Sequence, residues 1–296
     1  MRQLINEFIV EYITIRDITP KWGKRIKRMC LDFCDWMQLQ GIEPEIKNLN
    51  PGLCKKYVEF LKERYHNWSR RHSYNALKLF LNYLTRKNLL SQNPLKGIRY
   101  PSAHRKLPTT LSKEEYNVVL EKIKTLHFND PFLNLRNYLF FKLWQVSGLR
   151  VGEMVNLKIS DFYLNGEKNY VQIWNSKCER FDYLPIASKL VPLIQEYLST
   201  RGLNHSPYFF VATHHRGKLH YPAIFNLFAR LKREGCLRPD ITPHNIRATF
   251  CCQLLDNGVN VFEVQELMRH HSLNSTLFYV RNNPQKLQKH VDKLIE

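Results

Sequence analysis

Apolar positions in the first hundred residues recur with the period of an α-helix. Residues 4–13 and 26–37 space their large apolar side chains three and four apart, which predicts two helices with one buried face each. Asn50 and Pro51 supply a capping side chain and a proline at the first helical position, so a third helix is expected to begin there. A fourth is expected over residues 73–87. The pattern predicts an all-helical domain over residues 1–95.

A break in this pattern follows. Asn93-Pro94 interrupts the helical period, and residues 96–108 contain two more prolines and five basic side chains but no acidic one. Such a stretch is typical of an exposed connection. We therefore expect a basic interdomain linker over residues 96–110 and a second domain over residues 111–296.

The second domain is expected to mix helices with a small β-structure. A capping box begins a helix at Ser112, and another helix runs from Asp130 to Gly148. The apolar period then changes to two over residues 170–174 and 181–186, which predicts two strands joined by a turn at 176–180. From residue 188 onward the pattern is again helical, with a break at 258–260. The fold class expected is mainly α, with a β-hairpin or small sheet in the second domain.

Charge narrows the class of partner. The formal net charge is +19 and the pI is near 9.7, and residues 1–106 carry 21 Lys and Arg against 9 Asp and Glu, a net charge of +12. Such a field favours a polyanion, with nucleic acid ahead of an anionic membrane surface, because no apolar run is long enough to span a bilayer. Solvated helix faces are the alternative for individual clusters. The predicted DNA-contacting residues are Lys21, Lys24, Arg25, Lys27, Arg28, Arg70, Arg71, Lys96, Arg99, Arg105 and Lys106.

The cysteines and the N-terminus favour an intracellular protein. The seven cysteines are odd in number and lack the spacing of a zinc site or a redox motif, so we interpret Cys30, Cys34, Cys251 and Cys252 as buried thiols. Acidic residues interrupt the apolar positions of the first segment, unlike a secretory signal. Neither a metal nor a cofactor is expected.

Two pairs of side chains could act on a phosphate. Arg150 follows a glycine turn, and Glu153 lies three residues on, where its carboxylate can orient the guanidinium. His244 and Arg247 are also three apart, in the first turn of a helix expected to begin at Thr242, where the helix end favours an anion. A surface ion pair and a solvated helix turn are the alternative interpretations.

A tyrosine completes this set. Tyr279 lies nine residues after His270. A phosphodiester attacked by a phenolic oxygen develops charge on its non-bridging oxygens, and guanidinium and imidazole donors held in advance stabilise that charge. Lys177 lies near the tip of the predicted hairpin.

The order and spacing of these motifs resemble the tyrosine site-specific recombinases, also called the phage integrase family, and within it the two-domain Xer-like members and mobile-element integrases. The segments that carry the resemblance are SGLRVGEM, SKCERFDYLPI, HNIRATF and LMRHHSLNSTLFY. The resemblance covers essentially the whole chain. It implies a helical, SAM-like core-DNA-binding domain followed by an α+β catalytic domain.

The resemblance also implies a role for each residue of the site. Tyr279 would attack the scissile phosphate and hold the DNA 3′ end as a phosphotyrosine, while Arg150 and Arg247 clamp the non-bridging oxygens. Lys177 would protonate the departing 5′ oxygen.

The remaining residues would support this step. His244 would be the acid/base partner of the tyrosine, and His270 would donate to a phosphate oxygen. Glu153 would hold Arg150 and His244 in position.

Some positions depart from the family pattern. Ala248 stands where a second histidine is frequent, Ser176 and Cys178 stand where glycines usually flank the hairpin lysine, and Arg269 stands where glycine often precedes the histidine. None removes a reacting group. For Arg269, an added phosphate contact and a simply exposed side chain are equally compatible with the sequence.

The implied activity is strand exchange on double-stranded DNA through a Holliday junction, by a homotetramer on two duplexes, possibly with a paralogous recombinase or accessory protein, in the nucleoid of the cytoplasm. A terminal helix over residues 284–296 would dock on the neighbouring protomer, or else in cis. Integration of a mobile element is slightly favoured over resolution of DNA multimers or inversion, and the target sequence is left open. A type IB topoisomerase and a non-catalytic DNA-binding regulator are the alternative functions.

Overall fold

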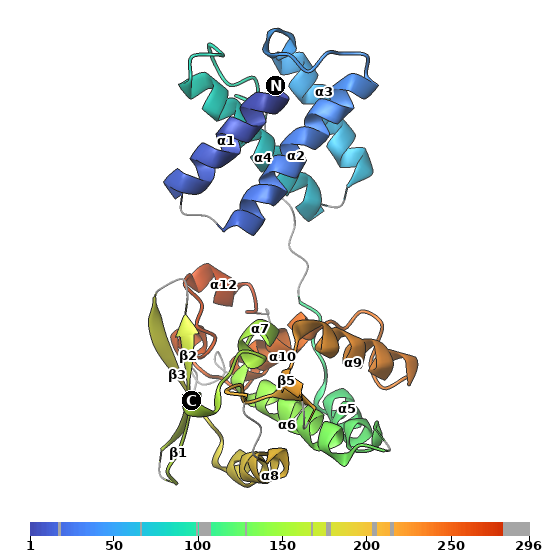
Figure 1. The fold of residues 1–296 in the computed structure, drawn as a ribbon, viewed down its shortest axis with the longest axis vertical. Helices are drawn as coiled ribbons and strands as arrows, with labels where there is room; N and C mark the ends of the chain where they lie inside the picture. Colours follow the sequence, from blue (N-terminus) through green and yellow to red (C-terminus); the bar gives the residue numbers. More distant parts are fainter. Residues whose placement is uncertain are drawn as a thin grey trace, which may run out of the picture. The chain divides into compact units, whose positions relative to one another are not determined.

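The chain divides into two compact units, Met1–Arg105 and Lys106–Glu296, drawn in Figure 1. The structure is a computed structural model, and it describes residues 1–16, 19–65, 67–98, 100, 108–127, 129–166, 168–175, 179–202, 206–213 and 216–280. Most of the predicted linker and the whole predicted terminal helix over residues 284–296 lie outside the described residues. The functions assigned to the two domains stay predictions.

The first unit is helical throughout its described part. Its elements are α1 (Arg2–Arg16), α2 (Pro20–Leu39), a 3-10 turn η1 (Ile46–Asn48), α3 (Pro51–Arg64) and α4 (Asn67–Arg86). The predicted apolar faces form one core, in which Phe8, Phe33, Leu61 and Phe80 are fully buried or nearly so. This core holds the helices together through burial of apolar area.

The helix ends of this unit follow the capping signals in the sequence, with one exception. Asn50 accepts a hydrogen bond from the Leu53 N–H at 2.9 Å, and Pro51 occupies the first helical position, as predicted. However, α4 begins at Asn67, six residues before the expected start at Ser73. Residues 67–72 are mostly polar, so the first turns of α4 leave no apolar period to detect.

Helices α5 (Lys113–Thr125) and α6 (Pro131–Ser147) begin the second unit. Ser112 and Glu115 form the predicted capping box, and Asp130 caps α6. The side chains that α6 buries include several aromatic rings, of which Phe140, Phe141 and Trp144 meet Phe210 and Phe228 from later elements. This aromatic cluster fixes the C-terminal end of α6, where the candidate site begins.

A three-stranded antiparallel sheet covers one side of the second unit (Figure 1). It consists of β1 (Phe162–Leu164), β2 (Asn169–Asn175) and β3 (Arg180–Pro185), preceded by η2 (Ile159–Asp161). Strands β2 and β3 pair Trp174 with Phe181 and Val171 with Leu184, which confirms the predicted hairpin. The fold is mainly helical with small antiparallel sheets, as predicted.

One expectation for the later part of the chain is wrong. Residues after 188 are not helical only, because β4 (Val211–Thr213) and β5 (Arg216–Lys218) form a second, two-stranded sheet between helices. Strands of three residues are too short to show a period of two. The other elements are η3 (Ser188–Leu190), α8 (Val191–Arg201), α9 (Tyr221–Arg233), α10 (Pro243–Asp256), α11 (Val261–Leu267) and α12 (Leu273–Leu277).

Gly148 at the end of α6 is required by both backbone and packing. Its φ is +55°, and a Cβ there would lie 2.2 Å from Cδ1 of Phe250 on α10. Gly148→Ala is expected to lower the free energy of unfolding by about 3 kcal/mol, about 1 from the left-handed backbone and about 2 from overpacking. Chemical denaturation measures this loss.

Gly258 is the matched control for this substitution. It also has a positive φ, of +86°, but its added Cβ would meet nothing within 4 Å. Gly258→Ala should therefore cost only about 1 kcal/mol. Equal losses for the two variants would contradict the close approach of α6 and α10.

Candidate active site

Arg150 enters the site from the turn that ends α6. It is the residue before α7 (Val151–Met154), and its N–H donates to Oε2 of Glu153 at 2.7 Å while its Nη1 donates to Oε1 at 2.8 Å. The Arg150 side chain is 47% exposed. Its guanidinium is thus hydrogen-bonded to Glu153 and remains accessible to solvent.

His244 and Arg247 lie in the first turn of α10, which occupies the middle of the unit (Figure 1). Arg247 is only 2% exposed. Its Nη1 donates to the Gly148 carbonyl at 2.6 Å, and its Nη2 donates to the Met268 carbonyl. The buried guanidinium therefore joins the end of α6 to the end of α11, while His244 lies at the exposed edge of the site.

The end of α11 brings the next residues into place. Arg269 has a φ of +50°, its N–H donates to the Glu266 carbonyl at 2.9 Å, and the His270 N–H donates to the Gln265 carbonyl at 3.0 Å. This is the Schellman arrangement, in which glycine is preferred at the left-handed position because a side chain there costs about 1 kcal/mol.

The Arg269 side chain contacts the carboxylate that also holds Arg150. Its Nη2 donates to Oε2 of Glu153 at 2.7 Å, and the side chain is 4% exposed. The side chain is therefore not a simply exposed one, and the sequence alone did not indicate its partner. Glu153 lies between two guanidinium groups.

Tyr279 and His270 lie side by side. Their rings are nearly parallel, 11° apart, with centroids separated by 6.1 Å. Nδ1 of His270 is 2.9 Å from Oγ1 of Thr276, which is fully buried on α12. Tyr279 is 8% exposed and packs in a cluster with Cys251 and Met268.

Burial and positive charge shift the pKa values of these groups. Burial, reinforced by Arg247, Arg150 and Arg269, lowers the pKa of His270 to about 4. Partial burial and the charges of Arg247 and Arg150 also lower the pKa of His244. Burial raises the pKa of the Tyr279 phenol. At neutral pH both imidazoles are therefore neutral and the phenol is protonated.

At Glu153 the neighbouring charges outweigh the effect of burial on the pKa. Burial alone would raise the pKa of Glu153, but the charge of Arg269 and the hydrogen bonds and charge of Arg150 outweigh it and lower that pKa. Burial lowers the pKa of Arg247 to about 10, so it remains a cation. The Glu153 carboxylate and the Arg247 guanidinium are therefore both charged at neutral pH.

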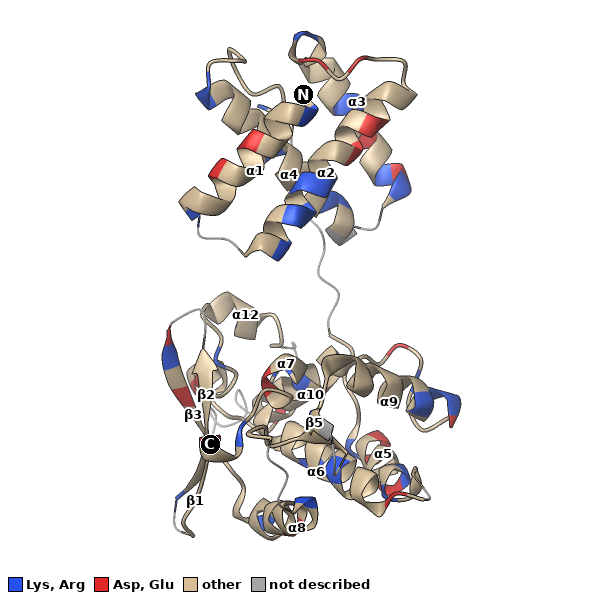
Figure 2. Cartoon of the chain, in the orientation of Figure 1, with Lys and Arg blue, Asp and Glu red and all other residues tan. Residues whose placement is uncertain are grey.

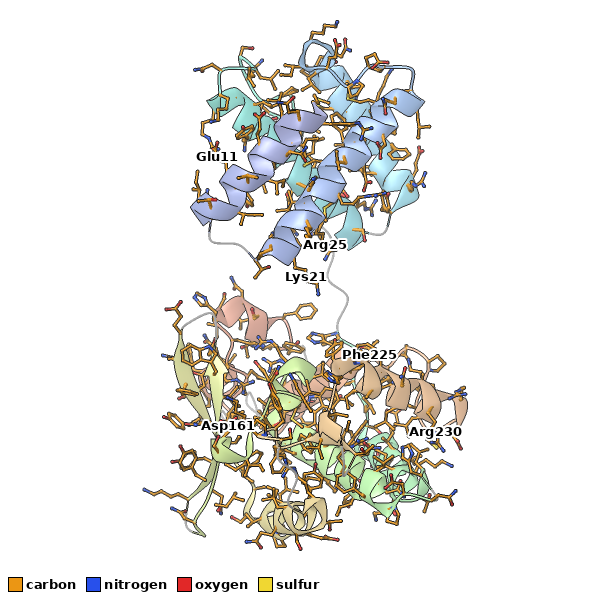
Figure 3. The ribbon with its side chains drawn as sticks, in the orientation of Figure 1. Glu11, Lys21, Arg25, Asp161, Phe225 and Arg230 are labelled. Atoms are coloured by element: carbon orange, nitrogen blue, oxygen red, sulfur yellow. The ribbon has the colours of Figure 1, made fainter. Side chains whose placement is uncertain are left out.

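Cavities open on two sides of these residues. One of about 420 Å³ is lined by Arg150, His244 and Arg247 together with Tyr221 and Phe225 of α9; Phe225 is labelled in Figure 3. Another of about 830 Å³ lies between Arg150, Glu153 and Arg269 and the sheet residues Trp174 and Phe181. Both are large enough to admit part of an extended ligand.

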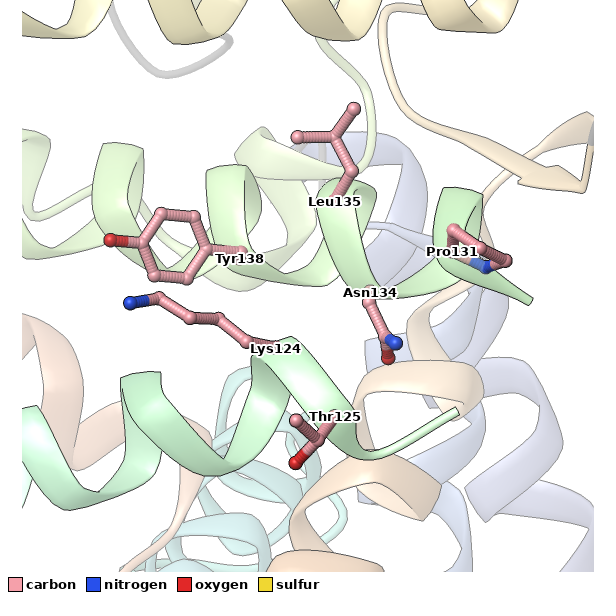
Figure 4. A pocket seen from close by; sticks show the side chains of 6 residues that line it. All are labelled: Lys124, Thr125, Pro131, Asn134, Leu135 and Tyr138. Carbon is pink, nitrogen blue, oxygen red and sulfur yellow. The ribbon is translucent and has the colours of Figure 1, made fainter. Parts of the chain in front are cut away.

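A further cleft, of about 390 Å³, lies between α5 and α6 and shares no lining residue with the candidate site (Figure 4). Its lysine, Lys124, lies 5.2 Å from the centre of the Tyr138 ring and forms an ion pair with Glu121. The cleft is therefore separate from the residues that the sequence singles out.

The other predicted site residues fall into two sets. Lys177, Arg99, Arg105 and Lys106 lie outside the described residues, so the assignments of the hairpin lysine and of most of the linker stay predictions. Lys21, Lys24, Arg25, Lys27 and Arg28 lie on the first half of α2, where Figure 2 shows basic residues gathered; Lys21 and Arg25 are labelled in Figure 3.

The second basic cluster of the first unit lies next to the first. The rings of Trp22 on α2 and His72 on α4 are 5.7 Å apart, and Arg70 and Arg71 directly precede His72. The guanidinium of Arg25 lies 5.5 Å from the centre of the Trp22 ring. Two sequence clusters nearly fifty residues apart thus form one basic surface, while Lys96 lies exposed beyond α4.

In the part of the chain that the structure describes, no three His, Cys, Asp or Glu side chains are grouped so as to hold a metal ion. The helices described there include none with the length and apolar character needed to cross a membrane. Cys30, Cys34, Cys251 and Cys252 are buried, as predicted.

Comparison with known proteins identifies the family. Residues 109–286 match the phage integrase family. The chain belongs to the tyrosine recombinases of this family. A tyrosine recombinase of Pseudothermotoga lettingae is 29% identical over 85% of each chain, and tyrosine recombinase XerD of Lacticaseibacillus casei is 30% identical over 72% of each. The Tn1549 transposon integrase, solved with transposon right end DNA, has the same fold, with a TM-score of 0.74, 16% identity and 99% of each chain covered.

The protein is therefore a recombinase, an enzyme of site-specific DNA recombination, as the resemblance implied.

The resemblance also implied that Glu153 holds both Arg150 and His244 in position. Within the described part of the chain, Glu153 bonds to Arg150 and Arg269, and no hydrogen bond joins it to His244. The hydroxyl of Thr276 is a further candidate that the sequence patterns did not single out.

The depressed pKa of His270 predicts a pH-dependent stability. Between about pH 6.5 and about pH 4 the unfolded chain binds a proton at this imidazole and the folded recombinase does not, so the free energy of unfolding falls as pH falls through this window. His270→Gln, which cannot titrate, should show a smaller fall. Thermal unfolding of DNA-free protein across the window measures the difference, and identical slopes for both proteins would contradict it.

Proposed function

We propose that this recombinase cleaves and rejoins duplex DNA at specific sites with Tyr279 as the nucleophile, forming a 3′-phosphotyrosine intermediate. The observation that supports the proposal most is the packing of Tyr279 beside His270, in the same unit that holds Arg150 and Arg247. Four candidate side chains from separate segments thus lie around one region suited to a phosphodiester.

The charge balance favours an anionic substrate. Arg150 and Arg269 both pair with the carboxylate of Glu153, while the buried Arg247 donates to two backbone carbonyls. A phosphodiester would supply the missing negative charge. Arg150, which is half exposed, is the guanidinium best able to contact its non-bridging oxygens, while the buried Arg247 supplies charge from a fixed position.

The proton transfers follow from the pKa shifts. Because the Tyr279 phenol is protonated at neutral pH, it needs a base, and the neutral imidazole of His244 can accept its proton. The phenolic oxygen then bonds to phosphorus as the bond from phosphorus to the 5′ oxygen breaks. Lys177 is the proposed donor of the proton that the leaving 5′ oxygen takes up. The bond energy stays in the phosphotyrosine, so religation needs no external source.

His270 would act as a donor. Nδ1 of His270 lies 2.9 Å from the Thr276 hydroxyl; when that hydroxyl donates to Nδ1, the proton of the neutral ring lies on Nε2. That N–H can donate to a phosphate oxygen. Thr276 would in this way select the tautomer that the reaction needs.

The basic surface on α2 and α4 is the proposed DNA contact of the first unit. Its cations suit backbone phosphates, which position a protein without reading sequence. That the Tn1549 integrase was solved with transposon right end DNA supports duplex DNA as the partner here. We further propose exchange by a tetramer through a Holliday junction, with integration or excision of a mobile element ahead of resolution of DNA multimers.

Tyr279→Phe tests the nucleophile. Incubated with nicked suicide duplexes from the surrounding genome, the unaltered protein should form a covalent adduct on a denaturing gel, and the variant should form none while binding DNA equally. Removal of one hydroxyl from a buried ring should not disturb the fold. Tight binding without any adduct would favour the regulator, and relaxation of supercoiled DNA without exchange would favour the topoisomerase.

Salt dependence tests the basic surface. If about eight phosphates are neutralised, log affinity should fall with log salt with a slope near −7. Lys24→Gln combined with Arg25→Gln should reduce that slope by about 2. The same changes at Lys55 and Lys56, which are exposed on α3, should leave it unaltered. A slope near zero would exclude DNA binding.

A further inference from the structure

Arg269 combines three features that together call for a function. It takes a left-handed φ of +50° at a helix end that favours glycine. Its long cationic side chain is only 4% exposed and forms an ion pair with the carboxylate of Glu153. Strain and desolvation both oppose this placement. A residue that overcomes both without contributing to the apolar core is a candidate for a role in the reaction.

The Glu153–Arg150 pair needs an anchor. Glu153 lies on α7, a helix of four residues, and Arg150 is the residue before that helix, with a side chain that is 47% exposed. A pair of this kind, taken alone, fixes neither partner firmly. Arg269 approaches the same carboxylate from a different element, at 2.7 Å from Oε2, the oxygen that also accepts the Arg150 N–H. Oε2 then accepts from two elements, the turn at Arg150 and the end of α11.

Arg269 is itself held by the end of α11. The N–H groups of Arg269 and His270 close the Schellman turn, and the carbonyl of Met268 accepts from the buried Arg247. The chain of contacts therefore runs from a rigid helix end through Arg269 and Glu153 to Arg150.

We infer that Arg269 is a positioning residue that acts through Glu153 to fix the guanidinium of Arg150 for its phosphate. This inference rests on the proposed role of Arg150 in DNA cleavage. Arg269 contributes orientation, because its charge is already matched by Glu153 within the protein. A direct contact of Arg269 with DNA is the competing role, and the two roles predict different couplings.

Arg269→Gly is the informative variant. Glycine relieves the left-handed backbone, so the variant should fold, yet it removes the anchor. Single-turnover formation of the covalent adduct should slow by about 10- to 100-fold, with little change in DNA affinity. Arg269→Lys, which keeps the charge but loses the planar donor, should recover part of the rate. Arg269→Asn, also tolerant of a positive φ, serves if the glycine variant is unstable.

Asn88 supplies a matched control. It occupies the corresponding left-handed position, with a φ of +59°, in the Schellman turn that ends α4, and it is exposed. Asn88→Gly makes the same backbone change without removing an ion pair. It should leave the rate of adduct formation unchanged.

A double-mutant cycle separates positioning from direct contact. If Arg269 acts through Glu153, Arg269→Gly should slow a Glu153→Gln protein little further, because the carboxylate is already lost. Additive losses would overturn the inference in favour of direct DNA contact, and an Arg269→Gly rate equal to that of the unaltered protein would overturn it outright. Absence of any adduct with the unaltered protein would instead reject the proposed function, and the inference with it.

Discussion

The geometry of the candidate site depends on the way α11 ends. Three consecutive residues at that end each reach a different part of the site: the Met268 carbonyl accepts from Arg247, the Arg269 guanidinium binds Glu153, and His270 lies beside Tyr279. Because the backbone turns through a left-handed residue, these groups leave one helix end in different directions. A single turn thus sets the relative positions of the nucleophile and the groups proposed to bind phosphate.

This arrangement is electrostatically unfavourable without an anion. Arg150 and Arg269 share one carboxylate, and burial lowers the pKa of Arg247 and of His270. The protein compensates with backbone carbonyls, two of which accept from Arg247, because these dipoles stabilise a cation without adding negative charge that would repel a phosphate. The buried cations lower the stability of the DNA-free protein, but they leave the site preorganised for its substrate.

The sequence predicted the elements and residues that local signals specify. Capping residues and prolines located the starts of α3, α5 and α6, and alternation located β2 and β3. The three-residue strands β4 and β5 carried no such signal. The burial of the Arg269 side chain could not be predicted either. It depends on the end of α11 lying against α7, and these two helices are more than a hundred residues apart in the sequence. The family pattern marked the position as unusual, but only the tertiary contact with Glu153 explains the side chain.

The position of the proposed nucleophile depends on one short element. Tyr279 follows α12, a helix of only five residues, whose Thr276 also contacts His270. A small displacement of α12 would therefore move the Tyr279 ring and separate Thr276 from the imidazole of His270 at the same time.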